Sequence, residues 1–422
     1  MKSRIILIIG PIFEGLKPWL VRNQAIVGMP ALYNLLIRLP RKGWNVHYIA
    51  VDTAGDFVKH KTKKRLRGIH VYLYHQPLPT LWHRFKKIVP SFGSIGSLLD
   101  YLVSIGRVAK IVNRVHPKII YASGGYCIAA YVLSVMKDIP NVTRVFGTLL
   151  TPYIPTKWLW LRKPIEGLAF KIPAKFWIIT DDGTQADTVA DFFRIPQNKR
   201  VFWRNGVNLS SYLNGFDGKQ FKKHLGISES QLIFLSTSRL DSWKRVDRII
   251  YALPEVTETF KNIRLLIVGN GREKDNLKGL ASSLNLNNYV QWISQVPHSE
   301  IPKYLSICDV FLSCYDYSNI GNTLLEAMVC GKCIIALNAG DTAKIIHHWS
   351  NGILINPDDS HNQLVYYMKY LIIHEEVRKN LGMRAQQYAL KEFQSWEQRI
   401  NKEIRLLASI INSKTYEKVI QQ

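Results

Sequence analysis

The chain has 422 residues, of which 47% are hydrophobic and 21% are charged. This length suggests two or three domains, and the composition excludes a disordered chain. The net charge of +25 is unevenly placed: residues 1–210 carry 31 basic and 10 acidic side chains, and residues 211–422 carry 25 and 21. Such an excess of cations in the first half predicts an anionic partner for that half.

Short apolar runs alternate with helical patterns along the whole chain. No run reaches 18 apolar residues without a charge, so a membrane-spanning helix is not expected. The start, "MKSRIILIIGPIFEG", fits a first strand better than a signal peptide. The predicted strands are 4–10, 45–51, 68–74, 118–123, 142–148 and 175–180, then 232–238, 264–269, 289–294, 308–314, 332–338 and 352–357.

Near-continuous apolar strands between amphipathic helices predict parallel sheets that are covered on both faces. Twelve strands fit two doubly wound α/β domains better than one sheet. We expect a first domain over 1–205, a Gly- and Asn-containing linker over 206–228 and a second domain over 229–390. The tail, 391–422, is expected to form a helix that can cross back to the first domain. Ligands of such sheets bind outside the carboxyl ends of the strands.

The first polar segment at a strand end is "STSRLDSWKRVD" (236–247). It places Arg239, Lys244 and Arg245 just before a predicted helix. Cations oppose the dipole at a helix N-terminus, and a bound anion would remove that conflict. A solvated basic turn, with Asp241 and Asp247 as local partners, is the alternative.

A second strand end carries Gly269, Asn270 and Gly271. This turn resembles the start of a dinucleotide fingerprint, but Lys274 occupies the third glycine position and no acidic residue follows at the expected spacing. Binding of nicotinamide or flavin is therefore weakly supported. The glycines would still let a ligand approach the backbone closely.

The third segment follows strand 308–314 and leads into a helix predicted from about Thr323 to Cys330. Its backbone N–H groups form a second candidate anion site. Glu326 has two interpretations: a capping-box partner of Thr323, or an acceptor of hydrogen bonds from sugar hydroxyls. The candidate residues of this segment are Ser318, Asn319, Gly321, Asn322, Thr323, Leu324 and Glu326.

Two anion sites at facing helix N-termini, in one half of a two-domain cleft, suggest a diphosphate, and a polyhydroxyl group joined to it suggests a nucleotide-sugar. With these motifs in place, the sequence resembles the retaining glycosyltransferases of family 4, most strongly over 230–360. The resemblance implies the GT-B fold, two facing Rossmann-like domains with a deep cleft. It implies that Arg239 and Lys244 hold the donor diphosphate, that Glu326 holds the ribose hydroxyls, and that Gly28 lies near the phosphates. "RNGVN" (204–208) also resembles the segment before the family's linker.

Three positions depart from the family pattern. The first carboxylate of its E-x7-E motif falls on Ser318, its His-Gly pair reads Phe146-Gly147, and a strand end that often carries histidines reads "YASGG" (121–125). The sequence therefore names no acid or base on the acceptor side.

The resemblance implies transfer of a hexose with retention, from a UDP- or GDP-sugar to a saccharide or a lipid-linked acceptor, in lipopolysaccharide or capsule synthesis for example. No cofactor beyond the nucleotide-sugar is expected. No Asp-x-Asp pair occurs in the sequence, so no divalent metal is expected. The pair Cys330 and Cys333 has metal or redox spacing but no second pair to complete a site, so we assign it a structural role.

Two basic, aromatic stretches in the first half suit a membrane interface. We expect peripheral attachment to the cytoplasmic face of the cell membrane, and a solvated basic surface is the alternative. The residues concerned are Trp82, Arg84, Lys86 and Lys87, and Trp158, Trp160, Arg162 and Lys163.

Other classes remain as alternatives. A nucleic-acid-binding protein would explain the charge, but no recognition motif accompanies it, so nucleic acid is not expected as a partner. A dinucleotide-dependent enzyme is limited by the incomplete glycine fingerprint. A GT-B epimerase or phosphorylase-like enzyme, or a non-catalytic glycosyltransferase homologue, would share the fold.

Overall fold

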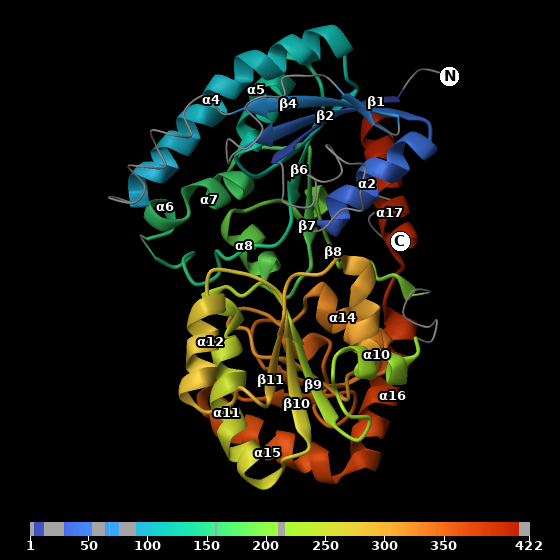
Figure 1. Cartoon of the computed structure of the whole chain (residues 1–422). Coiled ribbons are helices and arrows are strands. Elements are labelled where there is room, and N and C mark those ends of the chain that lie inside the picture. The colour runs from blue at the N-terminus through green and yellow to red at the C-terminus, as the bar shows by residue number, and fades with distance from the viewer. Residues whose placement is uncertain are drawn as a thin grey trace. The chain divides into compact units, whose positions relative to one another are not determined.

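The computed structural model describes residues 4–11, 29–52, 64–66, 68–75, 90–156, 158–209 and 216–412. Contacts within the chain divide it into two compact units. Unit 1 comprises Met1–Asp181, Gln185–Asn205 and Trp396–Gln422, and unit 2 comprises Asp182–Thr184 and Gly206–Ser395. The chain thus leaves unit 1, forms unit 2 and returns to unit 1, as the colour sequence in Figure 1 shows.

Unit 1 contains an eight-stranded sheet in the order β3-β4-β2-β1-β5-β6-β7-β8, counted over the described residues. All neighbouring strands pair in parallel except β3 with β4. The central strands are mostly apolar because helices cover both faces, and β6 is the exception, with Asn141, Thr143 and Arg144 buried. The bounds are β1 (Arg4–Pro11), β2 (Trp44–Asp52), β3 (Lys64–Leu66), β4 (Ile69–His75), β5 (Ile119–Ser123), β6 (Asn141–Val145), β7 (Phe176–Thr180) and β8 (Arg200–Trp203).

The helices of unit 1 form layers on this sheet. One core joins α2 and α17 to β1 and β2, and another joins α4 and α5 to the same strands and β5. A third core holds α7 and α8 against β6 and β7. The bounds are α2 (Pro30–Arg41), α4 (Pro90–Val115), η1 (Gly124–Tyr126), α5 (Cys127–Lys137), α6 (Leu159–Arg162), α7 (Pro164–Lys171), α8 (Ala186–Phe192), η2 (Gln197–Lys199) and α17 (Trp396–Ile411).

Helix α17 is held in unit 1 by buried charges as well as by apolar packing. The carboxylate of Glu403 accepts a hydrogen bond from Tyr121 Oη at 2.6 Å and pairs with Arg399 Nη1 at 2.9 Å. Arg144 lies 3.8 Å from the same carboxylate and donates to the carbonyl of Ile178 and to Thr180 Oγ1. Burial raises the pKa of Glu403, but the two guanidinium groups outweigh it and lower that pKa below its usual range.

Unit 2 contains a six-stranded sheet in the order β11-β10-β9-β12-β13-β14, parallel throughout. One face packs on α11, α12 and α15, and the other on α13, α14 and α16. Figure 1 shows α11 and α12 on one side of the strands and α14 and α16 on the other. The strands are β9 (Leu232–Thr237), β10 (Ile263–Val268), β11 (Val290–Ile293), β12 (Val310–Ser313), β13 (Cys333–Leu337) and β14 (Ile353–Ile355). The helices are α10 (Gly218–His224), η3 (Ser242–Lys244), α11 (Val246–Thr259), α12 (Lys274–Ser283), η4 (His298–Glu300), α13 (Ile301–Ile307), α14 (Asn322–Val329), η5 (Thr342–Lys344), η6 (Pro357–Asp359), α15 (Ser360–Ile373) and α16 (Glu375–Glu392).

Two of the described strands, β3 and β8, were not among the predicted strands, and helix α10 was not expected. Helix α10 lies within the segment expected to be a linker, and its Phe221 packs edge-on against Tyr304 of α13. None of the helices that the structure describes has the length and apolar character needed to cross a bilayer.

Candidate functional site

The polar segments singled out in the second half of the sequence follow β9, β10 and β12 in unit 2. These three strands are neighbours, in the order β10-β9-β12. Because the strands are parallel, their carboxyl ends lie at one edge of the sheet, where ligands of such sheets bind. The structure therefore brings Arg239, Lys244, Gly269–Gly271 and the loop before α14 to one edge.

Lys244 ends the short helix η3 between β9 and α11. Its Nζ lies 3.9 Å from the ring centroid of Trp243 and 3.7 Å from that of Tyr315. Burial and the nearby Arg239 guanidinium lower the pKa of Lys244 to about 7, although Asp182 and Asp241 oppose them. A bound anion would restore the charged form, so this lysine suits a phosphate ligand.

The other two cations of this segment are paired locally. Arg239 has a side chain that is 74% exposed and forms an ion pair with Asp241 at 3.1 Å. Arg245 pairs with Asp247 and Asp316. The local partners expected from the sequence are thus present, and they leave Lys244 as the cation that burial and aromatic rings surround.

Gly269 and Gly271 serve the packing of the chain itself. A Cβ on Gly269 would lie 1.9 Å from the carbonyl oxygen of Ser238, and one on Gly271 would lie 2.3 Å from that of Leu240. The neighbouring strand-end loop fills the space into which a side chain at either position would project. Asn270 is exposed, and its backbone carbonyl accepts from Leu240 N–H.

Asn319 and Ser318 fix the loop that precedes α14. Asn319 is fully buried: its Oδ1 accepts from Ser313 Oγ and Tyr315 N–H, and its Nδ2 donates to the carbonyl of Leu337. Ser318 Oγ donates to the carbonyl of Asp182 at 2.7 Å and accepts from Ile320 N–H. These two side chains hold the loop, so Ser318 has a structural role in the place of the family's first carboxylate.

Glu326 does not cap its helix, so the capping-box interpretation is wrong. Helix α14 begins at Asn322 with Gly321 as its N-cap, which places Glu326 in the fifth helical position, and Thr323 Oγ1 donates instead to the carbonyl of Thr237. The Glu326 side chain is 3% exposed, and its Oε1 lies 2.6 Å from His298 Nε2. Among the described residues, Glu326 Oε2 is buried with no hydrogen-bond partner.

His298 is a site residue that the sequence analysis missed. It belongs to η4, 28 residues before Glu326 in the chain. Burial lowers the pKa of His298, but the hydrogen bond to Glu326 and its negative charge outweigh burial and raise that pKa above its usual value. The pair fixes one carboxylate oxygen of Glu326 and leaves the other to accept from a ligand. Of the remaining candidates, Asn322 and Leu324 lie in the first turn of α14.

The basic candidates of unit 1 are described only in part. Gly28, Trp82, Arg84, Lys86 and Lys87 lie outside the described residues. The second stretch forms α6 and its flanks, and Trp158 and Trp160 are 55% and 42% exposed. Arg162 lies over the Trp158 ring at 5.6 Å, and Lys163 pairs with Glu166 at 3.2 Å. Aromatic and cationic side chains thus share one exposed surface.

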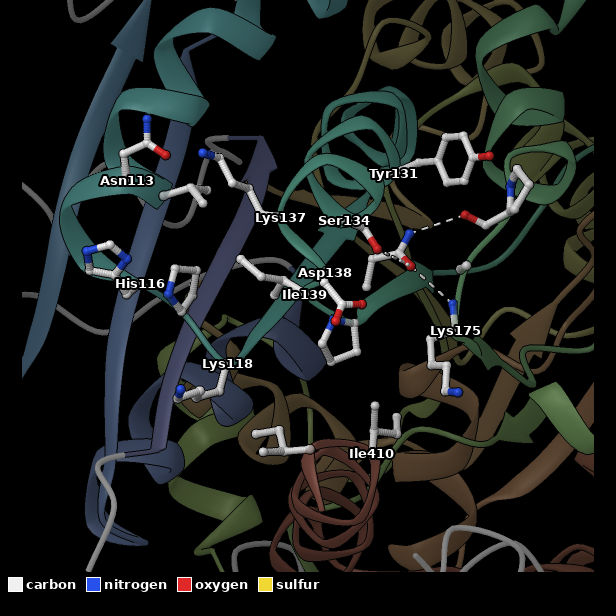
Figure 2. A pocket seen from close by; sticks show the side chains of 17 residues that line it. Asn113, His116, Lys118, Tyr131, Ser134, Lys137, Asp138, Ile139, Lys175 and Ile410 are labelled. Carbon is white, nitrogen blue, oxygen red and sulfur yellow. Dashed lines mark hydrogen bonds between the residues drawn. The ribbon is translucent and has the colours of Figure 1, made fainter. Parts of the chain in front are cut away.

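A hollow of about 810 Å³ in unit 1 gathers four basic side chains around one acidic one. Figure 2 shows His116, Lys118, Lys137 and Lys175 around it with Asp138. The buried Asn141 also lines it, where its Nδ2 donates to the carbonyl of Pro173 and its Oδ1 accepts from Lys175 N–H. It lies at the amino ends of β5, β6 and β7, the edge opposite to the one where ligands of parallel sheets bind. Helices α4 and α5 both end beside this hollow. Because helix C-termini favour cations, they account for basic side chains in this place.

Within the described part of the chain, no three His, Cys, Asp or Glu side chains gather as a metal site would require. Cys330 and Cys333 are free thiols, and burial raises the pKa of each to about 12. Such thiols are poor nucleophiles.

Comparison with known proteins places these features in a family context. Residues 217–388 match the family model "Glycosyl transferases group 1". N-acetyl-alpha-D-glucosaminyl L-malate synthase of Bacillus anthracis is 29% identical over 182 residues, 42% of this chain and 46% of that protein. Alpha-monoglucosyldiacylglycerol synthase of Acholeplasma laidlawii is 25% identical over 186 residues, which are 43% of this chain and 46% of that protein. The matched part spans about half the length of these relatives.

Solved structures match over almost the whole chain. Sucrose-phosphate synthase from Thermosynechococcus elongatus has a TM-score of 0.76 at 16% identity and covers 98% of this chain and 100% of its own. HepE of Anabaena, in complex with UDP and glucose, has a TM-score of 0.69 at 19% identity. The match covers 96% of this chain and 100% of the HepE chain. Two Rossmann-like α/β units of this kind form the GT-B fold, so the fold class predicted from the sequence is confirmed.

Proposed function

We propose that this chain is a retaining glycosyltransferase that transfers a hexose from a UDP- or GDP-sugar to a lipid-linked or cell-surface polysaccharide acceptor. The match of residues 217–388 to a glycosyltransferase model supports the reaction class. The donor site is the carboxyl edge of the unit 2 sheet. Relatives whose names include a diacylglycerol product support a lipid acceptor.

One observation carries the proposal: the free Oε2 of Glu326. This carboxylate oxygen is buried on α14 with no partner among the described residues, while His298 holds its neighbour Oε1. An unsatisfied buried acceptor costs about 1–3 kcal/mol, more when it is charged. Ribose hydroxyls of a bound nucleotide would donate to this oxygen and remove that cost.

In the proposed reaction the acceptor hydroxyl attacks the anomeric carbon on the face from which the nucleoside diphosphate leaves. The departing phosphate takes the hydroxyl proton. Arg239, Lys244 and the N-terminus of α14 stabilise the charge that develops on the diphosphate. Removal of one such donor typically lowers turnover by about 10²–10³. The absence of an Asp-x-Asp pair supports a reaction without a divalent metal, so turnover is expected to persist in EDTA.

A thermal-shift panel of UDP, GDP, ADP and NAD tests the donor site. We expect one nucleoside diphosphate to raise the unfolding temperature and NAD to have no effect. Arg239→Ala and Lys244→Ala are expected to lose the shift and the activity while the variants stay folded by circular dichroism. Stabilisation by NAD alone, or near-normal turnover of Lys244→Ala, would contradict the proposal. A nucleotide shift without transfer to any acceptor would favour the non-catalytic alternative.

We also propose that unit 1 attaches peripherally to the anionic cytoplasmic face of the cell membrane. The exposed Trp158 and Trp160, with Arg162 over the first ring and Lys171 over the second, support this, because indole rings sit at bilayer interfaces and cations bind anionic headgroups. Binding to phosphatidylglycerol vesicles is expected to weaken in Trp158→Ala and Arg162→Gln. Lys175→Gln, at the amino edge of the same sheet, serves as the charge control. Equal loss in the control would point to net charge instead of this surface.

A further inference from the structure

The structure contains a second cavity at a carboxyl sheet edge, this one within unit 1. It has a volume of about 250 Å³ and lies beyond the ends of β5 and β6, under α7. Ligands of parallel sheets bind at this edge. Aromatic and aliphatic side chains from α4, α7 and the two strand-end loops form most of its wall.

Aromatic rings form fixed walls of this cavity. Tyr101 and Tyr126 meet edge-to-face with ring centroids 4.8 Å apart. A Cβ on Gly125 would lie 2.2 Å from the ring of Tyr101, so the missing side chain is what lets the ring rest on this turn. The ring of Phe146 carries the Arg144 guanidinium at 4.4 Å from its centroid. Rings held in this way keep the cavity open.

The charged side chains on the walls are already paired within the protein. Arg144 donates to the carbonyls of Val145 and Ile178 and to Thr180 Oγ1. Glu166 pairs with Lys163. The lining also includes Ser123 and Thr148, but apolar atoms form most of its exposed wall, so a buried sugar ring would find too few partners for all of its hydroxyl groups, which is costly. An apolar group would meet ring faces and aliphatic carbons instead.

We infer that this cavity binds an apolar group of the acceptor, so that the acceptor is an amphiphile whose hydroxyl lies at the sheet edge while its hydrocarbon enters unit 1. This inference rests on the proposed transferase function and specifies its acceptor class. It also explains Phe146, which stands where the family pattern has the histidine of a His-Gly pair. The phenylalanine ring gives the cavity an apolar wall in place of a titratable imidazole.

Binding of alkyl glucosides to the full chain tests the inference. The probes are methyl, butyl and hexyl β-D-glucopyranoside below micelle-forming concentrations, measured by calorimetry or saturation-transfer NMR. Affinity is expected to rise about fourfold with each methylene that enters the cavity, the factor that corresponds to ~0.8 kcal/mol per buried CH₂. Ala169→Leu fills the cavity and should remove this dependence on chain length. Phe146→Ala enlarges it and should shift the best fit to a longer chain, and Lys175→Ala serves as the control.

Equal affinity for the methyl and hexyl probes would overturn the inference, and so would a chain-length gain that survives unchanged in both cavity variants. Circular dichroism and thermal unfolding establish that the variants fold, and Phe146→Ala keeps the test informative if Ala169→Leu does not. The two proposals fail separately. A chain-length gain without any nucleotide shift would show that the cavity binds apolar groups but refute the transferase, and the acceptor role of the cavity with it. A nucleotide shift without the gain would leave the transferase proposal standing and refute the cavity assignment.

Discussion

Lys244 and Glu326, at the carboxyl edge of the unit 2 sheet, are charged side chains in largely buried surroundings. Lys244 lies against two aromatic rings with a pKa of about 7, and Glu326 has one oxygen bound to His298 and one without a partner among the described residues. Each is a group whose environment is incomplete until something binds. Lys244 titrates near neutral pH, and Glu326 contacts a histidine whose charge also changes with pH.

Nucleotide affinity is expected to depend on pH through Lys244. Its pKa is lowered to about 7 in the free protein, so above pH 7 a diphosphate must bind together with a proton. The dissociation constant for UDP or GDP should then rise by up to about tenfold per pH unit between pH 7.5 and 9. Lys244→Arg, which stays charged, should show a flat profile. Titration calorimetry in buffers of different ionisation enthalpy measures the proton uptake directly, and none at pH 8.5 would exclude this mechanism.

The His298–Glu326 pair gives a second expectation. Glu326→Gln should weaken nucleotide binding by roughly 1.5–3 kcal/mol, the range for hydrogen bonds to charged groups. His298→Ala should weaken it less, because it frees the carboxylate to rotate without removing it, and His298→Asn should restore part of the loss. Because the pKa of His298 is raised, the pair stabilises the fold fully below about pH 6.5 and less as pH rises through the raised pKa. Equal nucleotide affinity in His298→Ala and the unmodified chain would remove this residue from the site.

Sequence reasoning singled out Glu326 but gave it the wrong local alternative. The spacing of Thr323 and Glu326 matches a capping box, yet the helix begins one residue earlier and Thr323 bonds to β9. His298 was missed because it comes from another segment, and pairing across 28 residues leaves no periodic signal. The sequence identified Gly269 and Gly271 as places of close approach, and the structure shows that one group close to them is the backbone of the neighbouring strand-end loop.

At the scale of elements, continuous apolar runs identified twelve strands to within a few residues because buried parallel strands have no polar face. The two missed strands lack that signal. β3 is a three-residue edge strand, Lys64–Leu66, with two cations, and β8 is the short edge strand Arg200–Trp203. Edge strands are commonly short and charged. The tail that contains α17 was expected to be helical, but its Glu403 was not assigned a partner.

The charge network on α17 predicts a large stability effect. Glu403→Gln leaves Arg144 and Arg399 buried without their counter-charge, so we expect a loss of about 3–5 kcal/mol in the free energy of unfolding of unit 1. The double variant Glu403→Gln with Arg399→Met should recover part of it. The exposed Glu397, in the first turn of the same helix, provides the matched control Glu397→Gln. Chemical denaturation measures all three, and a change below about 1 kcal/mol in Glu403→Gln would show that the network contributes little.

For the whole molecule, the two units differ in how the chain builds them. Unit 2 is nearly continuous, from Gly206 to Ser395, whereas unit 1 needs Trp396–Gln422 in addition to its first half. The core of unit 1 includes Trp396, Ile400 and Leu407 packed with α2 and β1. The excess of positive charge, which favours solubility, lies in the first half of the chain. The stability of unit 1 depends in addition on α17, near the other end of the chain.

A fragment comparison follows from this arrangement. Residues 206–395 are expected to unfold cooperatively as an isolated domain, whereas 1–205 should bind a hydrophobic dye and lack a sharp thermal transition. Addition of a peptide covering 396–411 should restore part of the transition in the 1–205 fragment. A cooperative transition of 1–205 alone would show that α17 is dispensable for the core.

The return of α17 also orders events during synthesis. At about 5–20 residues per second, a ribosome needs roughly 10–40 s to pass from the end of β8 to the start of α17. During that interval unit 2 is still being synthesised, and the sheet face of unit 1 that α17 covers stays open to solvent. The nascent chain therefore offers chaperones a defined, time-limited binding surface, and its duration is set by the length of the inserted unit.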